Sequence, residues 1–221
     1  MLAWLVIGGG LHGTHLSLVL RARGVAAGAV QVVDPHERPL HAFWRMAGAL
    51  GMSHLRSPSV HHLDLGPYDL LQFAERSAHR RRACFRPPYG RPTLAIFAAQ
   101  VEELVRRAEL DALRARAWAR ALRPVEGGWE VETDRGALRA RRVILAIGAS
   151  EQPCWPPWAR AAAARGLAVE HVFAPTFERA AIDVAARVAV VGGGISAAQL
   201  AGALAPRQVV LGSRPPYRVH W

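Results

Sequence analysis

Residues 2–34, LAWLVIGGGLHGTHLSLVLRARGVAAGAVQVVD, decide the fold class of this 221-residue chain. The continuous apolar run over 2–7 predicts a buried parallel strand, and the pattern over 14–23 predicts a helix after it. A second apolar run over 30–33 predicts another strand, which ends in Asp34. The predicted apolar side of the helix consists of Leu16, Val19 and Leu20. Strand, helix and strand in this order indicate an α/β fold with a parallel sheet.

The glycines between the first strand and the helix satisfy the pattern G-x-G-x-x-G over residues 8–13. Gly8 permits a tight turn, Gly10 lets the backbone approach a pyrophosphate, and Gly13 allows close packing of helix on strand. The free N–H groups at the helix start favour an anion. Asp34 follows at the distance where an acid accepts from ribose hydroxyls. The candidate cofactor-binding residues here are Gly8, Gly10, Leu11, His12, Gly13 and Asp34.

The composition narrows the function classes. The formal net charge of +11 is typical of nucleic-acid-binding proteins, but all 28 basic residues are Arg, and the sequence lacks both Lys and Asn. This usage indicates the codon bias of a GC-rich genome, so we expect no nucleic-acid partner. The absence of Lys excludes Schiff-base chemistry and a Walker-A lysine. Phosphates must therefore be held by backbone N–H groups or by Arg.

The cysteines and histidines do not predict a metal centre. Cys84 and Cys154 form no Cys-x-x-Cys motif, which argues against a disulfide scaffold, a zinc site and a redox dithiol. Residues 35–67 are rich in His and Pro, and we expect them to be irregular. A metal site among their histidines is an alternative, but no pair has the spacing of a zinc helix, so loop histidines beside a cofactor cleft are favoured. The histidines concerned are His36, His41, His54, His61 and His62.

The apolar N-terminal residues 1–20 resemble a signal anchor only superficially. No positive n-region precedes Leu2, and Gly8, Gly9, Gly10 and Gly13 interrupt the stretch. We therefore expect no membrane association and a cytoplasmic protein.

The middle of the chain changes from helical to strand-like periodicity. Amphipathic patterns predict helices over 68–79 and 93–107. Period-two patterns and a Gly-containing turn predict a small antiparallel β-meander within about 116–140. Its expected strands are 118–122, 128–132 and 137–140. A further apolar strand is expected over 142–147.

A second glycine-rich motif follows an apolar strand predicted over 187–191. Residues 192–197 read G-x-G-x-x-A and open a helix predicted over 196–204, and the next strand is expected over 208–211. No acid follows that strand. Arg214 is placed to meet the 2′-phosphate of NADP, and a solvated loop arginine is the alternative. The candidate residues here are Gly192, Gly194, Ile195, Ser196, Ala197, Ser213 and Arg214.

This order of elements resembles the glutathione-reductase-like flavoproteins, although an NAD-first dehydrogenase could begin in the same way. The resemblance is carried by the two fingerprints, the meander and the closing strand VILAIG at Val143–Gly148, where Ile147 replaces the family's Thr. It implies FAD at the first motif and NADPH at the second, with Ala146 and Gly148 near the FAD. It also implies that the strand around Trp118 presents backbone groups to the adenine.

Two shorter motifs narrow the resemblance. GMSHLRSP at 51–58 and the Ser-Arg-Pro-Pro that ends at Pro216 resemble flavin-dependent monooxygenases of the lysine/ornithine N-hydroxylase type. The resemblance places Met52 at the cofactor. It implies that NADPH reduces FAD and that reduced flavin activates O₂ to hydroxylate a small molecule. It identifies no catalytic acid or base.

The expected organisation is an FAD-binding domain over 1–152 and a partial NADPH-binding domain over 153–221. The second domain is short, so a truncated product, a fragment or completion by a separate chain all remain open. Two other functions also remain: an FAD-linked reductase of a protein electron carrier, and a nucleotide-binding fragment without turnover. The substrate and the oligomeric state are not predicted.

Overall fold

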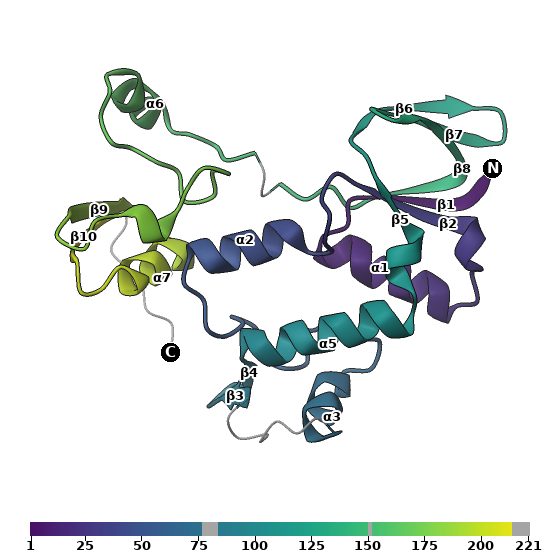
Figure 1. Ribbon diagram of the computed structural model, residues 1–221, viewed down its shortest axis with the longest axis horizontal. Coiled ribbons are helices and arrows are strands. Elements are labelled where there is room, and N and C mark those ends of the chain that lie inside the picture. The colour runs from purple at the N-terminus through teal and green to yellow at the C-terminus, as the bar shows by residue number, and fades with distance from the viewer. Residues whose placement is uncertain (77–83, 150–151, 214–221) are drawn as a thin grey trace. The chain divides into compact units, whose positions relative to one another are not determined.

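The computed structural model describes residues 1–76, 84–149 and 152–213, and its contacts divide the chain into two compact units. The first unit combines Met1–Phe43 with Ser53–Gly148. The second combines Trp44–Met52 with the residues from Ala149 onward. Figure 1 labels the elements of both units.

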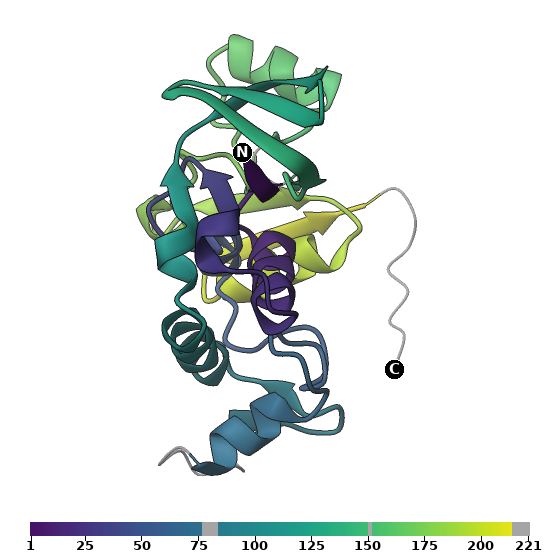
Figure 2. The same ribbon diagram turned by 90° about the vertical axis from the view of Figure 1, so that its right-hand side faces the viewer.

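A six-stranded mixed sheet forms the centre of the first unit, in the order β5-β2-β1-β8-β7-β6. Parallel pairs join β1 to β2, β2 to β5 and β1 to β8, whereas β6–β7 and β7–β8 are antiparallel. Figure 2 shows the antiparallel strands continuing from the parallel part of the sheet. The strands are β1 (Leu2–Ile7), β2 (Val30–Asp34), β5 (Arg114–Arg116), β6 (Ala119–Val125), β7 (Gly128–Thr133) and β8 (Gly136–Leu145).

Strand β8 joins two strands that the sequence predicted separately, over 137–140 and 142–147. Its first half pairs with β7 and its second half with β1, and Ala140 has a partner in both. The sequence pattern changes within β8 because the partner strand changes, so period alone suggested a break. The prediction was also wrong at the end, because β8 stops at Leu145 and Ile147 is 70% exposed.

Helix α1 (Leu11–Ala22) begins three residues earlier than predicted and buries a different face. Its buried residues are Gly13, Thr14, Ser17 and Leu18, whereas the predicted apolar residues are only half-buried. The small residues permit close packing, and the hydroxyls of Thr14 and Ser17 donate to the carbonyl oxygens of Gly9 and Gly13. Polar groups are inexpensive to bury when they are hydrogen-bonded in this way.

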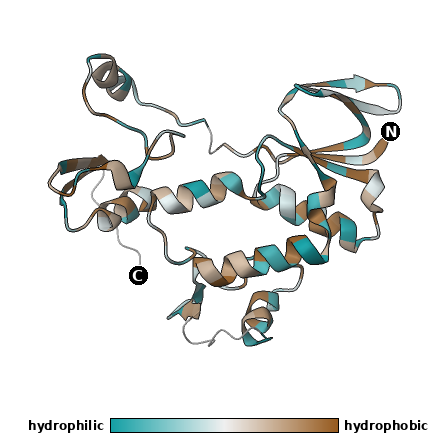
Figure 3. Cartoon of the chain, viewed as in Figure 1, coloured by the Kyte–Doolittle hydropathy of each residue, from teal (hydrophilic) through white to brown (hydrophobic). Residues whose placement is uncertain are grey.

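The other helices of the first half of the chain are partly as predicted. Helix α5 (Leu94–Arg107) matches the expected helix, and the hydroxyl of its N-cap Thr93 accepts from Ile96 N–H at 3.3 Å. Figure 3 shows hydrophilic and hydrophobic residues mixed along α5, as its amphipathic pattern predicts. Helix α3 spans Asp69–Arg76. The expectation that 35–67 is irregular was wrong for α2 (His41–Ala49), whose flanking Pro and His residues masked its apolar positions.

The second unit contains a βαβ segment. Strand β9 (Arg187–Val191), helix α7 (Ile195–Ala203) and strand β10 (Gln208–Gly212) follow the predicted order, and the strands are parallel. Its core includes Leu50, Val190, Leu200 and Leu204. The sequence did not predict α6 (Pro157–Ala164), nor the short antiparallel pair of β3 (Phe85–Arg86) and β4 (Arg91–Pro92) in the first unit. The α/β fold of Rossmann type, with its meander and second βαβ segment, is confirmed.

Candidate functional site

The first glycine-rich loop is closed by backbone contacts that exclude side chains. Gly8 donates its N–H to the Val33 carbonyl at 2.8 Å and has a φ of +105°, a conformation that L-residues rarely adopt. A Cβ at Gly8 would fall on the carbonyl oxygen of Ala146, and a Cβ at Gly13 would fall on that of Gly8. The first and third glycines of the motif are therefore required by the fold itself.

Gly10 differs from these two glycines because its side-chain position is open. A Cβ there would meet no atom within 4 Å. Gly10 is the N-cap of α1, with no side-chain cap, and the first turn holds no acid. The N–H groups of that turn have no intrahelical partner, so they attract an anion. Space and positive polarity at this point fit a pyrophosphate.

Asp34 lies beside this loop at the end of β2 and is 8% exposed. Its Oδ2 accepts from Gly9 N–H at 2.6 Å, and its Oδ1 accepts from His36 N–H at 2.9 Å. Nη2 of Arg114 lies 3.8 Å from Oδ1. A carboxylate has about four acceptor positions, so Asp34 retains capacity for a ribose hydroxyl in addition to these bonds.

Trp118 follows Ala117, whose N–H donates to the Asp34 carbonyl at 3.2 Å, and both backbone polar groups of Trp118 have a protein partner. Its N–H donates to Oδ1 of Asp134 at 2.8 Å, and its carbonyl accepts from Asp134 N–H at 3.1 Å. The Trp118 carbonyl can still accept a second hydrogen bond, so the expectation that the strand around Trp118 offers backbone groups to an adenine stays a prediction. Its indole ring is 47% exposed, with the Arg120 guanidinium 5.9 Å from it, and this ring is what Trp118 presents.

Three further residues lie beside the first loop, and of these the sequence pointed to His36 and His41 but not to Arg114. His36 stacks on His41 with ring centroids 4.1 Å apart and meets Trp118 edge-on at 6.4 Å. The sequence suggested only that these histidines line a cofactor cleft, and this stays a prediction. Arg114 had no signal that separated it from the other arginines, because its strand β5 was not predicted.

The second loop repeats the backbone construction of the first. Gly192 donates its N–H to the Gly212 carbonyl at 2.9 Å, as Gly8 does to Val33. Ser213 therefore occupies the position that Asp34 has in the first unit. Gly194 is the N-cap of α7, without a side-chain cap, and a Cβ there would meet no atom within 4 Å. This loop also leaves a helix start open to an anion.

The predicted site residues fall into two groups that follow the two units. The first loop brings together Gly8, Gly10, Leu11, His12, Gly13, Asp34, Trp118, Ala146 and the nearby Gly148. The second unit holds Gly192, Gly194, Ile195, Ser196, Ala197 and Ser213. Met52 packs against the core of the second unit, and its predicted role at the cofactor stays a prediction. Arg214 lies outside the described residues.

A metal centre and a membrane-spanning helix are two further possibilities for the described residues 1–76, 84–149 and 152–213. There, no cluster of three or more His, Cys, Asp or Glu side chains could hold a metal ion. In the same residues, every helix is too short or too polar to cross a membrane. Cys84 is buried and Cys154 is exposed, and both are free thiols.

Solved structures resemble this chain in fold. A flavin-containing monooxygenase from Stenotrophomonas maltophilia is 19% identical, with a TM-score of 0.67, and the match covers 98% of this chain and 58% of that one. A mutant cyclohexanone monooxygenase from Rhodococcus sp. Phi1, bound to NADP⁺, is 22% identical, with a TM-score of 0.65 and coverage of 96% and 38%. The bacillithiol disulfide reductase of Staphylococcus aureus is 12% identical, with a TM-score of 0.57, and the match covers 98% of this chain and 60% of that one. This chain thus spans less than two thirds of each of these proteins.

Family models identify the chain more specifically than these structures do. The model described as FAD-NAD(P)-binding matches residues 5–150, and the model described as L-lysine 6-monooxygenase/L-ornithine 5-monooxygenase matches residues 102–221. A comparison with curated proteins gives no match. Each family match covers more than half of the chain, and both agree with the resemblance seen in the sequence. The chain therefore belongs to the FAD-NAD(P)-binding family and, through its residues 102–221, to the L-lysine 6-monooxygenase/L-ornithine 5-monooxygenase family.

Proposed function

We propose that this chain forms the cofactor-binding part of an FAD-dependent, NADPH-using monooxygenase that acts on a small molecule. FAD binds at the first loop and NADPH at the second. The observation that carries this assignment is the difference between two loops of equal backbone construction, one followed by Asp34 and the other by Ser213. When bound, the flavin supplies the redox chemistry between NADPH and O₂.

The residues of the first loop have separate tasks in this proposal. The N–H groups at the start of α1, beyond Gly10, bind the pyrophosphate. Asp34 accepts from the ribose, as acids at this position do. The exposed indole of Trp118 offers the adenine an aromatic surface.

The second loop favours NADPH over NADH because the position that corresponds to Asp34 is Ser213 and not an acid. A carboxylate at that position would accept from the ribose 2′-hydroxyl of NADH but would repel the 2′-phosphate of NADPH. The Ser213 hydroxyl can instead donate to a phosphate. Arg214 stays a predicted phosphate ligand.

A crossed pair of substitutions tests both assignments. Both Gly10 and Gly194 have open side-chain positions and extended backbone, so Val fits the fold at either site but occupies the space of the pyrophosphate. We expect Gly10→Val to weaken FAD binding at least about 100-fold and to spare NADPH, and Gly194→Val to do the reverse. Flavin absorbance and quenching of NADPH fluorescence measure the two ligands. Stoichiometric FAD retained by Gly10→Val would refute the first site.

The same preparation separates the proposed reaction from its alternatives. A monooxygenase consumes O₂ with NADPH only when its substrate, here expected to be an amine, is present. NADPH oxidation that requires a ferredoxin-like acceptor would instead identify a carrier reductase. Binding of both nucleotides without turnover would identify a non-catalytic role.

We also propose a cytoplasmic location. The apolar segment that resembles a signal anchor is used as β1 and α1 of the first unit, which supports this proposal. Cell fractionation tests it, and recovery with membranes would contradict it.

A further inference from the structure

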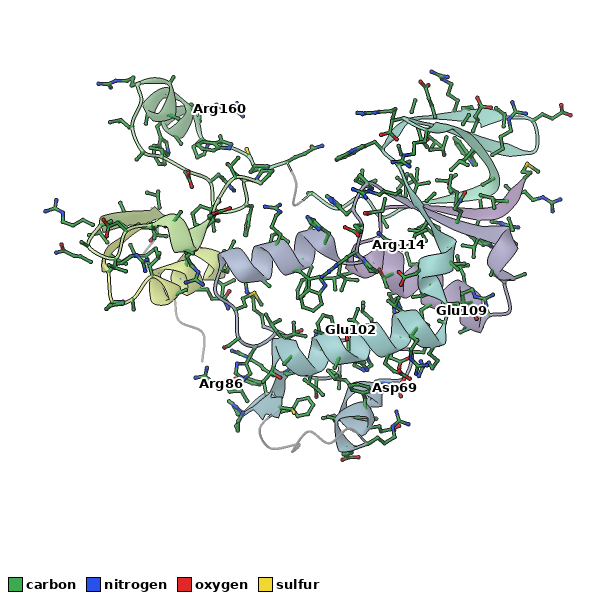
Figure 4. The ribbon with its side chains drawn as sticks, viewed as in Figure 1. Asp69, Arg86, Glu102, Glu109, Arg114 and Arg160 are labelled. Carbon is green, nitrogen blue, oxygen red and sulfur yellow. The ribbon has the colours of Figure 1, made fainter. Side chains whose placement is uncertain are left out.

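Arg114 is a nearly buried cation beside the first loop. It lies on β5 opposite Val32 of β2, and its side chain is 11% exposed. Its Nη2 donates to the His36 carbonyl at 2.8 Å and lies 3.8 Å from Oδ1 of Asp34. Figure 4 labels Arg114, which reaches from β5 toward the start of α1. A Cβ at Gly9 would lie 2.6 Å from its Nη1, so the guanidinium packs directly against the loop.

Gly9 is held at both its backbone polar groups. Its N–H donates to Oδ2 of Asp34 at 2.6 Å. Its carbonyl accepts from Leu40 N–H at 2.9 Å and from the Thr14 hydroxyl at 3.2 Å. The backbone that leads into Gly10, and hence into the anion-binding turn, is therefore fixed partly by one carboxylate.

The negative charge of Asp34 disfavours the binding of an anionic ligand beside it. Asp34 is a negative charge close to the position where the fold places a pyrophosphate, and like charges repel strongly where water is scarce. The guanidinium of Arg114 lies 3.8 Å from Asp34 and packs against Gly9, so it offsets this charge. Its Nη2 serves both the His36 carbonyl and Asp34 while its Nη1 packs against Gly9, and the single ammonium of Lys would not reach both places at once.

We propose that Arg114 is a positioning residue for the pyrophosphate-binding loop: it fixes Asp34, which fixes Gly9, and it neutralises the carboxylate beneath the ligand. This inference rests on the proposed binding of FAD at the first loop. Arg114 itself does not touch the ligand. Its contribution passes through Asp34, and the two residues must therefore act as a coupled pair. We call this chain of contacts, from Arg114 through Asp34 to Gly9, the lock.

The first test uses ADP, which carries the ribose and pyrophosphate of FAD, in calorimetric titrations. We expect Arg114→Met and Asp34→Asn each to weaken ADP binding about tenfold. The double variant should also lose only about tenfold, because both changes break one lock. Arg114→Lys, which keeps the charge but not the fork, should recover part of the loss. A hundredfold loss in the double variant, or no loss in Arg114→Met, would overturn the proposal.

The matched control is Arg116→Met, two residues along the same strand. Arg116 is exposed, and among the described residues its side chain donates from Nε to the Pro35 carbonyl at 3.3 Å. It should bind ADP within about twofold of the unchanged protein, because it lies outside the lock. An equal loss in Arg116→Met and Arg114→Met would show a general effect of removing positive charge from β5, and would also overturn the proposal.

A second measurement needs no nucleotide and therefore separates this inference from the proposed function. In protein labelled with ¹⁵N-glycine, the Gly9 amide proton should resonate downfield because it donates a short bond to a carboxylate. Arg114→Met and Asp34→Asn should shift this signal upfield, while the Gly24 and Gly127 signals stay in place and report an intact fold. A Gly9 signal unmoved by Arg114→Met refutes the lock. Wild-type protein that shows the signal but binds neither ADP nor FAD refutes the proposed function instead.

Discussion

The two glycine-rich loops of this chain share a backbone and differ in the side chains placed on it. In each, the first glycine donates its N–H to a carbonyl at the end of the neighbouring strand, at 2.8 Å for Gly8 and 2.9 Å for Gly192. In each, a glycine without a side-chain cap starts the helix. The residue that follows this carbonyl is the buried Asp34 in the first unit and Ser213 in the second.

This comparison separates two kinds of recognition. The shared backbone is suited to a pyrophosphate, which FAD and NADPH both contain, and carries no preference between them. The preference resides in one side chain per unit, Asp34 or Ser213. Close packing of helix on strand differs as well, since Gly13 of the first motif corresponds to Ala197 of the second.

The largest expected effect comes from exchanging these packing residues. Gly13→Ala places a methyl group on the Gly8 carbonyl, and a buried backbone atom cannot move aside easily. We expect a loss of about 3 kcal/mol in the free energy of unfolding, with loss of FAD binding. Ala197→Gly only removes a methyl group from a helix and should cost about 1 kcal/mol. Urea unfolding measures both. Equal effects would mean that the two helices approach their strands equally closely.

A smaller effect is expected from exchanging the recognition residue of the second unit. Ser213→Asp recreates the side chain of the first unit, and its charge should repel the 2′-phosphate and weaken NADPH binding about tenfold or more. NADH binding should stay the same or improve. Gln208→Asp, at the exposed start of β10, controls for an added charge and should change neither affinity. If Ser213→Asp weakened both nucleotides equally, Ser213 would not be the counterpart of Asp34.

Local backbone requirements made most of the fold predictable from the sequence. Several features follow from the requirements of one short segment alone: the glycines at 8, 10 and 13, the apolar runs of β1, β2 and β9, and the start of α5. Such local requirements can be read directly from the residue types and the spacing of apolar residues in the sequence. The α/β fold and the two cofactor loops could therefore be predicted before any contact was known.

What the sequence could not give depends on pairing between distant segments. Arg114 can lie beside Asp34 only because β5 pairs with β2, some eighty positions away in the chain. In the sequence, nothing distinguishes it from the other arginines among the 28. The backbone partner of Trp118 was likewise not predicted, because Asp134 follows β7 and meets Trp118 only through the pairing of β6 with β7. The continuity of β8 was hidden because its two halves have different partners.

The smallest effect concerns pH and applies to the second unit. Partial burial lowers the pKa of His171 from its usual 6.5, and its Nδ1 accepts from Phe173 N–H at 3.1 Å, so folding favours the neutral ring over the protonated one. As the pH falls below about 6.5, the unfolded chain takes up a proton that the folded chain does not, and stability is lost until the folded pKa is reached. We expect His171→Asn, which keeps an acceptor but does not titrate, to remove this part of the pH dependence.

Thermal unfolding of the unchanged protein and of His171→Asn is measured at pH 7.5 and at pH 5.5. The change in melting temperature between the two pH values should differ by about 2 °C or less between these proteins, because His171 is only half-buried. Trp155 lies 5.9 Å from the His171 ring, so its fluorescence reports the same protonation in the folded state. His12, which is exposed at the first loop, provides the comparison between the units. If His12→Asn removed as much of the pH dependence as His171→Asn, the acid sensitivity would not be specific to the second unit.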